Sequence, residues 1–522
     1  MTPATARPAG RFTTDVLVIG GGAAATWAAL TAARSGRSVI LVDKGHVGTS
    51  GTAAAGRGDV WDAARATRDR RVEAAAHRAE LGAGLADRLR LEQVLDETAD
   101  RLDEWERVSG ERTLPGATHL RWQRSRLQRL AVRIFDHSPV LELVVDADGA
   151  VAGARGLQRG TAYEIRAAAT VLATGSCGFG ARAIGCDVNF GDGALLAAEV
   201  GADLSGMEFT EVTPVTPEPN PVLSTAFSSW ARFYRADGSP LTGANGVRGR
   251  AVVAKAALSE PIYCRLDRAD PPVRSALRLA QPAFFASFDA DGINPFAEKF
   301  PVSVLFEGAV RSSGGVLIRG DDGATGVPGL YVAGDAAGRD HVFGAIPGTP
   351  AENTAWAIAS GAWAGSGAAG FAARLGGGHC SRPARPAGRA GLRPIGPAGT
   401  DYRTVLRTAQ AEILPYDRGS LRHGDRLRSS LPVLDAMWAR VRTSLHAGQG
   451  DAVRARQAAA VLAVARWTYA AALARTESRG VHRRADHRAP DPAQAHRVLV
   501  GGLDTVWSRP EAVPNGRELQ RV

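Results

Sequence analysis

The earliest residues in the chain with the types and spacing for chemistry are glycines that follow an apolar run. Val16 to Ile19 leads into Gly20 to Gly22, then an Ala-rich helical pattern and a second apolar run that ends at Asp43. In such a strand–turn–helix–strand unit Gly20 permits the tight turn and Gly22 lets the backbone approach a pyrophosphate, while Ala25 allows close helix–strand packing. Asp43, 23 residues after the first glycine, would accept hydrogen bonds from ribose hydroxyls. The pattern predicts dinucleotide binding.

Two further strand ends narrow this prediction to FAD. Residues 329–335 form a short apolar run that closes on Gly334 and Asp335, and an acid at such a strand end can bind the hydroxyls of a flavin's ribityl chain. A helix expected to begin near Thr349 to Asn353 would point its positive end at the pyrimidine edge of the isoalloxazine ring. The other strand end is a small-residue turn made of Ala173, Thr174 and Gly175. Three such elements in one chain indicate FAD.

Six more stretches carry a family pattern: Lys44-Gly45, Thr49 to Ala55, Gly82 to Asp87, Phe190 to Gly193, Gly206 to Phe209 and Arg475 to Asp486. In type and order they resemble the flavoprotein subunits of succinate dehydrogenase and fumarate reductase, a superfamily shared by L-aspartate oxidase and adenylylsulfate reductase. The resemblance touches nearly the whole chain. It implies an FAD-dependent oxidoreductase in which Lys44, Ser50, Thr52 and Asp192 help to bind the cofactor.

One departure from the family concerns the attachment of the flavin. Members with covalently bound flavin carry a histidine immediately after the serine of the Ser-x-Thr stretch. Here that position is Gly51, which has no nucleophilic side chain. We therefore expect noncovalent FAD, as in L-aspartate oxidase and adenylylsulfate reductase.

A second departure concerns the substrate. Dicarboxylate-handling relatives hold the substrate carboxylates with two histidines and an arginine. Thr213 and Val310 stand at the histidine positions, and the segment Gly344 to Pro350 contains no arginine. A dicarboxylate needs charge-assisted bonds at both ends to be held for hydride transfer. Succinate, fumarate and aspartate are therefore not the expected substrates.

Arg250 is the catalytic candidate that the resemblance leaves. Its stretch, Arg250 to Ala256, is similar to the one whose arginine shuttles a proton in fumarate reductase, but Ala251 replaces the acid that follows there. An arginine pKa above about 12 makes a poor acid without help from its surroundings, so a solvated surface arginine is the alternative interpretation. Other polar residues near the motifs allow both a pocket role and a structural role: Glu211, His341, Arg479 and His482.

Composition sets limits on the class of protein. Of 522 residues, 63 are basic and 53 acidic, a net charge of +10, yet 60 of the basic residues are arginines spread along the chain among acids. That distribution, without a nucleic-acid-binding motif, argues against nucleic-acid binding. The four cysteines form no Cys-x-x-Cys pair, so we expect no iron–sulfur cluster and no metal site in this chain. Without a membrane span or signal peptide in the sequence, we expect a cytoplasmic protein.

The expected architecture is α/β: a Rossmann-like FAD-binding domain split by an α+β capping domain and followed by a C-terminal helical domain. We place the first part of the FAD domain at 1–205, the capping domain at 206–305 and the second part of the FAD domain at 306–372. A Pro-, Gly- and Arg-rich linker is expected at 373–400, and the helical domain at 401–522.

These observations predict hydride transfer between a small organic substrate and flavin N5. A small amine, a hydrazine-like compound or a carbonyl-conjugated metabolite is an open possibility for the substrate, and oxygen is one possible electron acceptor. The alternatives are a flavoprotein subunit that exchanges electrons with a separate ferredoxin-like iron–sulfur protein, and a flavin-binding protein that has lost catalysis.

Overall fold

The large sheet of the FAD domain begins with the βαβ unit predicted from the glycines. The computed structural model describes residues 8–49, 51–55, 60–110, 116–180, 188–217, 229–245, 249–280, 282–308, 312–446 and 450–511. Five parallel strands lie in the order β3-β2-β1-β6-β13. Their bounds are β1 Gly10–Ile19, β2 Val39–Val42, β3 Arg133–Phe135, β6 Thr161–Leu172 and β13 Leu330–Val332. Because these strands are parallel, their carboxyl ends meet at one edge of the sheet.

Antiparallel strands extend this sheet from the same edge of β6 that pairs with β13. β5 (Val151–Gln158) pairs with β6, and β4 (Val140–Asp146) pairs with β5. A late strand, β14 (Ala384–Pro386), adds to β4. The mixed sheet and its helices confirm the predicted α/β class.

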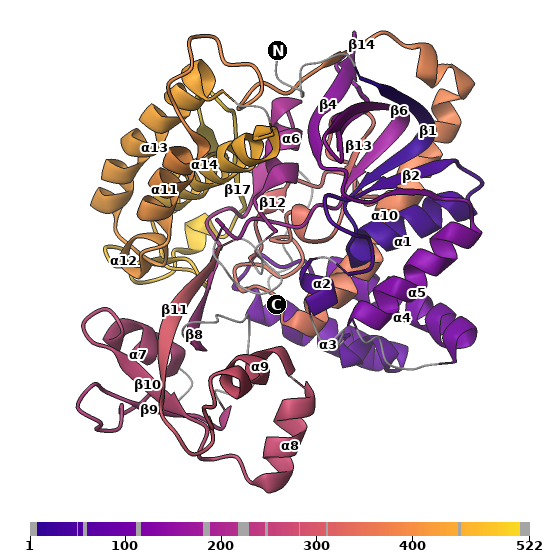
Figure 1. Ribbon diagram of the computed structural model, residues 1–522. Coiled ribbons are helices and arrows are strands. Elements are labelled where there is room, and N and C mark those ends of the chain that lie inside the picture. The colour runs from indigo at the N-terminus through magenta and orange to yellow at the C-terminus, as the bar shows by residue number, and fades with distance from the viewer. Residues whose placement is uncertain are drawn as a thin grey trace.

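Small residues let two helices lie close together over this sheet (Figure 1). α1 (Ala23–Arg34) packs against α10 (Pro350–Leu375). A Cβ on Gly361 would lie 2.5 Å from the carbonyl oxygen of Ala24, and one on Gly365 would lie 2.3 Å from that of Ala28. The further helices on the same side of the molecule are α2 Thr52–Ala55, α3 Arg68–Leu81, α4 Arg88–Ser109 and α5 Gly116–Arg129.

The capping domain is a separate lobe at the lower left of Figure 1. Its antiparallel sheet has the order β8-β11-β10-β9 and packs with three helices around a phenylalanine-rich core. The elements are β8 Glu211–Pro217, β9 Arg232–Tyr234, α7 Gly249–Ala256, β10 Ile262–Arg265, α8 Pro271–Ala280, α9 Pro282–Ala290 and β11 Phe300–Gly308.

The segment that we expected to be a flexible linker, 373–400, has a definite place. α10 continues to Leu375, and β14 then joins the large sheet at β4. Arg382 pairs with Asp146, and Arg393 pairs with Glu142 at 2.6 Å. Proline is tolerated because β14 is an edge strand, and the arginine pairs hold the segment against the sheet.

The C-terminal part is mostly helical but returns to the FAD domain. α14 (Ala452–Ala474) is buried nearly all round between its neighbours, which is typical of a core helix. The last strands, β17 (Val498–Gly501) and β18 (Trp507–Pro510), form one sheet with the earlier β7 (Leu204–Ser205) and β12 (Gly315–Val316). The remaining elements are α6 Asp192–Glu199, α11 Tyr402–Ile413, α12 Tyr416–Gly419, β15 Leu421–Arg422, α13 Gly424–Ser444 and β16 Arg483–Arg484.

Candidate cofactor-binding and active site

The turn from β1 to α1 has the geometry of a phosphate cradle. Gly20 adopts φ +127°, and a Cβ there would lie 2.1 Å from the carbonyl oxygen of Ala173. A Cβ on Gly22 would have no atom within 4 Å, so this glycine faces open space. Gly22 is also the N-cap of α1, and no side chain caps the helix there. Ala25 is fully buried. The open first turn, with its backbone N–H groups and positive helix end, suits a pyrophosphate.

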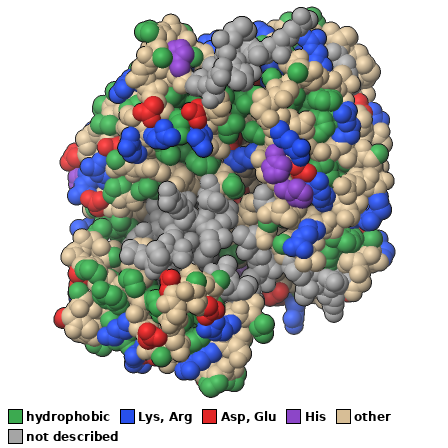
Figure 2. All heavy atoms as spheres, in the orientation of Figure 1, with side chains coloured by type: hydrophobic (Ala, Val, Ile, Leu, Met, Phe, Trp, Pro, Cys, Tyr) green, Lys and Arg blue, Asp and Glu red, His purple; other side chains and the backbone are tan. Residues whose placement is uncertain are grey.

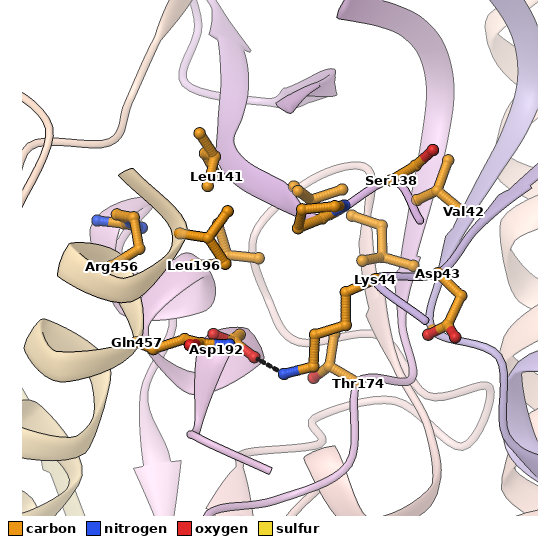
Figure 3. Close-up of a pocket in the computed structure, with 15 residues that line it drawn as sticks. Val42, Asp43, Lys44, Ser138, Leu141, Thr174, Asp192, Leu196, Arg456 and Gln457 are labelled. Atoms are coloured by element: carbon orange, nitrogen blue, oxygen red, sulfur yellow. Dashed lines mark hydrogen bonds and ion pairs between the residues drawn. The ribbon is translucent and has the colours of Figure 1, made fainter. Parts of the chain in front are cut away.

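Residues after β2 line a pocket at the carboxyl edge of the sheet (Figure 3). Asp43 is half-buried, accepts from the backbone N–H of Gly45 at 3.1 Å, and lies directly beside Gly21, where a Cβ would approach its carboxyl carbon to 2.8 Å. Lys44 reaches across the pocket to Asp192 at 2.5 Å, so these two predicted site residues neutralise each other.

The far wall of this pocket comes from other parts of the chain. Leu141 and Leu196 supply apolar surface, and α14 of the helical domain contributes Arg456 and Gln457. The pocket thus joins apolar walls to the Asp43 carboxylate. That combination fits an adenosine whose ribose hydroxyls donate to Asp43.

The turn after β6 approaches the same place. Thr174 lines the pocket. A Cβ added to Gly193 in α6 would lie 2.1 Å from the Oγ1 atom of Thr174, so α6 packs closely against this turn. Gly175 adopts φ +72° beside Asn189. The structure therefore brings Gly20, Asp43, Lys44, Thr174 and Asp192 to one pocket.

The Gly-Asp turn after β13 lies against the first turn of α1. A Cβ on Gly334 would lie 2.7 Å from the Cβ of Ala24. Asp335, the next residue in the chain, therefore lies near the glycine cradle at the start of α1. Burial raises the pKa of Asp335, and its ion pair with Arg339 opposes that rise. An ionised Asp335 can accept from ribityl hydroxyls, as the sequence predicted, and Arg339 favours that ionised form.

Arg339 is a residue that the sequence reasoning missed. Its side chain is fully buried and donates to Asp335, to the carbonyl oxygen of Ser312, and to Asn353 Oδ1 at 3.2 Å. It thus joins the Gly-Asp turn, the approach to β12 and the first turn of α10. The sequence did show an arginine four residues after Asp335, the acid predicted to bind the ribityl chain. It lies outside Gly344 to Pro350, the segment in which the family pattern places its arginine.

α10 begins where the sequence predicted a helix, but its N-terminus carries its own cap. Thr349 Oγ1 accepts from the N–H of Glu352 at 3.3 Å, and Glu352 accepts from the N–H of Thr349 at 2.6 Å. Arg78 pairs with Glu352 at 3.1 Å. Arg339, which donates to Asn353 in this first turn and pairs with Asp335, places a cationic group beside the N-terminus of α10.

Several predicted residues lie outside what the structure describes. Ser50 is one, and the side chains of Arg250, Glu211 and Thr213 are others, as is Val310. Arg250 lies in α7 of the capping domain. Thr52 begins α2. The ring of His341 packs edge-on against Trp356, and burial lowers its pKa well below the usual value, so it stays neutral.

The Arg475–Asp486 stretch forms a buried ionic network between domains. Arg475 bonds Glu208 and Glu477, each at 2.8 Å, and all three side chains are fully buried. Arg479 pairs with Glu477 and donates to the carbonyl oxygen of Ala83. His482 contacts Arg422 at 2.7 Å, and burial together with that arginine holds its pKa well below the usual value. Arg479 therefore makes an interdomain hydrogen bond, whereas the partners of His482, Arg422 and the carbonyl oxygen of Arg475, lie within the helical domain.

Other features of the described residues bear on the remaining predictions. Burial raises the pKa of Cys177 to about 12, typical of a core thiol. Within the described ranges, no group of His, Cys, Asp and Glu suited to a metal ion is found. No described helix is long and apolar enough to cross a membrane. On the face in Figure 2, basic side chains are spread out, with acidic ones among them.

Comparisons with known proteins identify the family of this chain. The FAD binding domain family matches residues 15–126 and 117–227, and the fumarate reductase flavoprotein C-terminal family matches 413–505. An L-aspartate oxidase of Mycobacterium tuberculosis is 30% identical, with 96% of this chain and 97% of the relative covered. One of Streptomyces coelicolor is 30% identical over 72% of this chain and 67% of the relative.

Solved structures share the fold at lower identity. An E. coli quinol fumarate reductase chain superimposes with a TM-score of 0.78 at 20% identity, with 97% of both chains covered. Adenylylsulfate reductase from Archaeoglobus fulgidus gives 0.74 at 16% identity, also with 97% of both chains covered.

The match to the FAD binding domain family identifies an FAD-binding flavoprotein. The chain belongs to the succinate dehydrogenase/fumarate reductase flavoprotein superfamily, to which the L-aspartate oxidases also belong. The predictions of this family, of FAD and of an FAD-dependent oxidoreductase are thereby confirmed.

Proposed function

We propose that this oxidoreductase holds FAD noncovalently and acts on a small organic substrate other than a simple dicarboxylate. The observation that carries the substrate proposal is the segment Gly344 to Pro350. The structure describes all of this segment, and none of its side chains is cationic. Its backbone contacts the neighbouring elements; for example, Arg78 donates to the carbonyl oxygen of Ile346 at 2.6 Å. A carboxylate held there would have no charge-assisted donor from this segment.

The cofactor would be held mainly by backbone groups and two acids. The cradle from Gly20 to Gly22 would bind the pyrophosphate, Asp43 the adenosine ribose and Asp335 the ribityl chain. The remaining predicted contacts are Ala25, Lys44, Ser50, Thr52, Ala173, Thr174, Gly175, Asp192 and Gly334. Gly51 supports noncovalent binding, because its Cβ position faces open space and offers no nucleophile.

The redox chemistry belongs to the cofactor: bound FAD exchanges a hydride with the substrate at N5. The chain would supply orientation, electrostatics and proton transfer. Arg250 remains our proposal for the proton-transfer group, placed by α7 in the capping domain. Arg339 would keep Asp335 ionised and keep positive charge beside the first turn of α10.

Anaerobic bleaching of the flavin absorption by a panel of compounds tests the proposal. We expect reduction by an amine, a hydrazine-like compound or a carbonyl-conjugated metabolite, and none by succinate. Denatured protein should release all its flavin into the supernatant. Flavin that stays with the precipitated chain would contradict noncovalent binding, and a purified chain that binds no FAD would contradict the proposed site.

A second candidate is oxidation of L-aspartate. It is favoured by the 30% identity to L-aspartate oxidases along nearly the whole chain. L-aspartate therefore belongs in the same panel. If it reduces the flavin as fast as the best other compound, the non-dicarboxylate proposal fails and this second candidate replaces it.

The electron acceptor can be resolved in the same preparation. Adenylylsulfate reductase shares the fold, and a ferredoxin-like iron–sulfur protein is one acceptor that we propose; oxygen is the other. Rapid reoxidation of the reduced flavin by oxygen alone would favour an oxidase. Slow reoxidation that an added ferredoxin accelerates would favour the protein partner. A flavin that no compound reduces would favour a chain that has lost catalysis.

A further inference from the structure

A second hollow lies away from the cofactor pocket, between the edge of the large sheet and the helical domain. It holds about 850 Å³ of empty space, part of it open to solvent. One side is made by β14 and the residues after it, the other by α13 and the turn between β17 and β18. It shares no lining residue with the cofactor pocket, and the buried Glu199–Arg456 ion pair stands between them, with one partner lining each.

The sheet side of this hollow carries two arginines without acidic partners. The Arg-rich segment has four arginines in this region, and two of them, Arg382 and Arg393, pair with acids of β4. Arg385 and Arg389 instead line the hollow, are exposed, and make no ion pair or side-chain hydrogen bond with any described residue. This accounts for an arginine-rich stretch that cofactor binding leaves unexplained.

The helical side carries a third arginine with an unused donor. Arg442 donates through Nε to Asp504 at 2.8 Å, and its Nη1 is buried without a hydrogen-bond partner among the described residues. A buried guanidinium donor without an acceptor is costly, and a small movement of the Arg442 side chain would present this donor to an anion in the hollow. The other carboxylate in the hollow, Glu199, is satisfied by Arg456 and by the backbone N–H groups of Arg389 and Ala390.

We propose that this hollow binds a small phosphate-bearing anion with two or more negative charges. Three arginines from two domains line it, while one exposed carboxylate, Asp504, already accepts from Arg442 and Trp438. Planar guanidinium groups match phosphate oxygens with paired hydrogen bonds, which makes arginine the residue suited to this ligand class. An occupant would join the FAD domain to the helical domain through its phosphates.

Titration calorimetry with inorganic pyrophosphate on the FAD-loaded protein tests this site. Loading with FAD keeps pyrophosphate out of the β1–α1 cradle, and the ionic strength is held constant. We expect saturable binding in the parent and roughly tenfold or greater weakening in the double variant R385Q/R389Q. R442Q should weaken binding independently. The matched control is R70Q, because Arg70 is an exposed arginine of α3, across the molecule, and makes no side-chain hydrogen bond or ion pair with any described residue.

The outcomes separate the source of the phosphate. ADP that binds tenfold tighter than pyrophosphate identifies a nucleotide, and equal affinities identify a free polyphosphate; both support the site. No saturable binding, or equal weakening in R70Q and R385Q/R389Q, overturns it. Because the arginines at 385 and 389 are exposed, the double variant should keep its flavin spectrum and its Tm.

Discussion

The N-termini of α1 and α10 lie in the same domain and solve the same problem in opposite ways. Both helices begin with backbone N–H groups that need acceptors. At α10 the side chains of Thr349 and Glu352 accept from backbone N–H groups in a capping box, and Arg78 pairs with Glu352, whereas the N-cap of α1 is Gly22, which has no capping side chain. From this difference, and from the close-packed glycine turn beside it, we infer that the end of α1 is left open for the FAD pyrophosphate. For the capped end of α10 we expect a mainly structural role.

The largest effect should come from filling the turn that shapes the open end. Gly20→Ala places a Cβ 2.1 Å from a backbone oxygen at φ +127°, so strain and overlap together should cost about 4 kcal/mol of unfolding free energy. Chemical denaturation measures this. Gly22→Ala is the matched control, since its Cβ meets nothing, and its unfolding free energy should stay close to that of the parent. Equal losses in both variants would contradict the geometry.

A negative charge at the N-terminus of α1 should prevent FAD binding without changing the stability of the fold. Gly22→Asp would cap α1 with a carboxylate where the pyrophosphate is expected, and FAD affinity should fall about 100-fold while the apoprotein keeps its Tm. Fluorescence titration of the apoprotein with FAD measures the loss. Gly22→Asn caps without charge and should weaken FAD much less. If Asn and Asp variants lose affinity equally, charge repulsion is not the reason.

Asp340, in the segment between β13 and α10, should make the stability of the protein depend on pH. It is fully buried, accepts from Ser205 at 2.9 Å and lies 4.0 Å from Arg497, and burial raises its pKa from the usual 3.8 to about 6, with Glu208 and Glu511 adding to the rise. The folded state therefore holds this proton more tightly than the unfolded chain does. The stability that the group contributes is present below its unfolded pKa and is lost as the pH rises through about 6.

Asp340→Asn should remove that loss. Relative to the parent, the variant should gain about 1.5 kcal/mol of unfolding free energy between about pH 5 and pH 7.5. Denaturation curves at both pH values measure the difference, and most other titrating groups cancel between the two proteins. A constant difference across this range would show that Asp340 is ionised throughout in the folded protein.

Local patterns allowed much of this to be predicted from sequence, and tertiary contacts account for the rest. The βαβ unit, the Gly-Asp turn and the start of α10 depend on residues adjacent in the chain, so strand runs, glycines and a Thr-Pro start reveal them. Arg339 was missed because its role depends on Ser312 and Asn353, which only the fold brings to it. Residues 373–400 suggested a linker from composition, but pairing of β14 with a strand more than 200 residues earlier is invisible in composition.

The smallest effect should come from removing the side-chain cap at the N-terminus of α10. Thr349→Ala removes the side-chain acceptor for the N–H of Glu352 and should cost about 1 kcal/mol of unfolding free energy. Thr354→Ala in the same helix is the control, because its hydroxyl only bonds back to the carbonyl of Pro350 and should be close to neutral. FAD affinity should change little in either variant if the α10 end is scaffold. A drop in FAD affinity in the Thr349 variant as large as that in the Gly22→Asp variant would mean that both helix ends hold the cofactor, and the contrast between them would be lost.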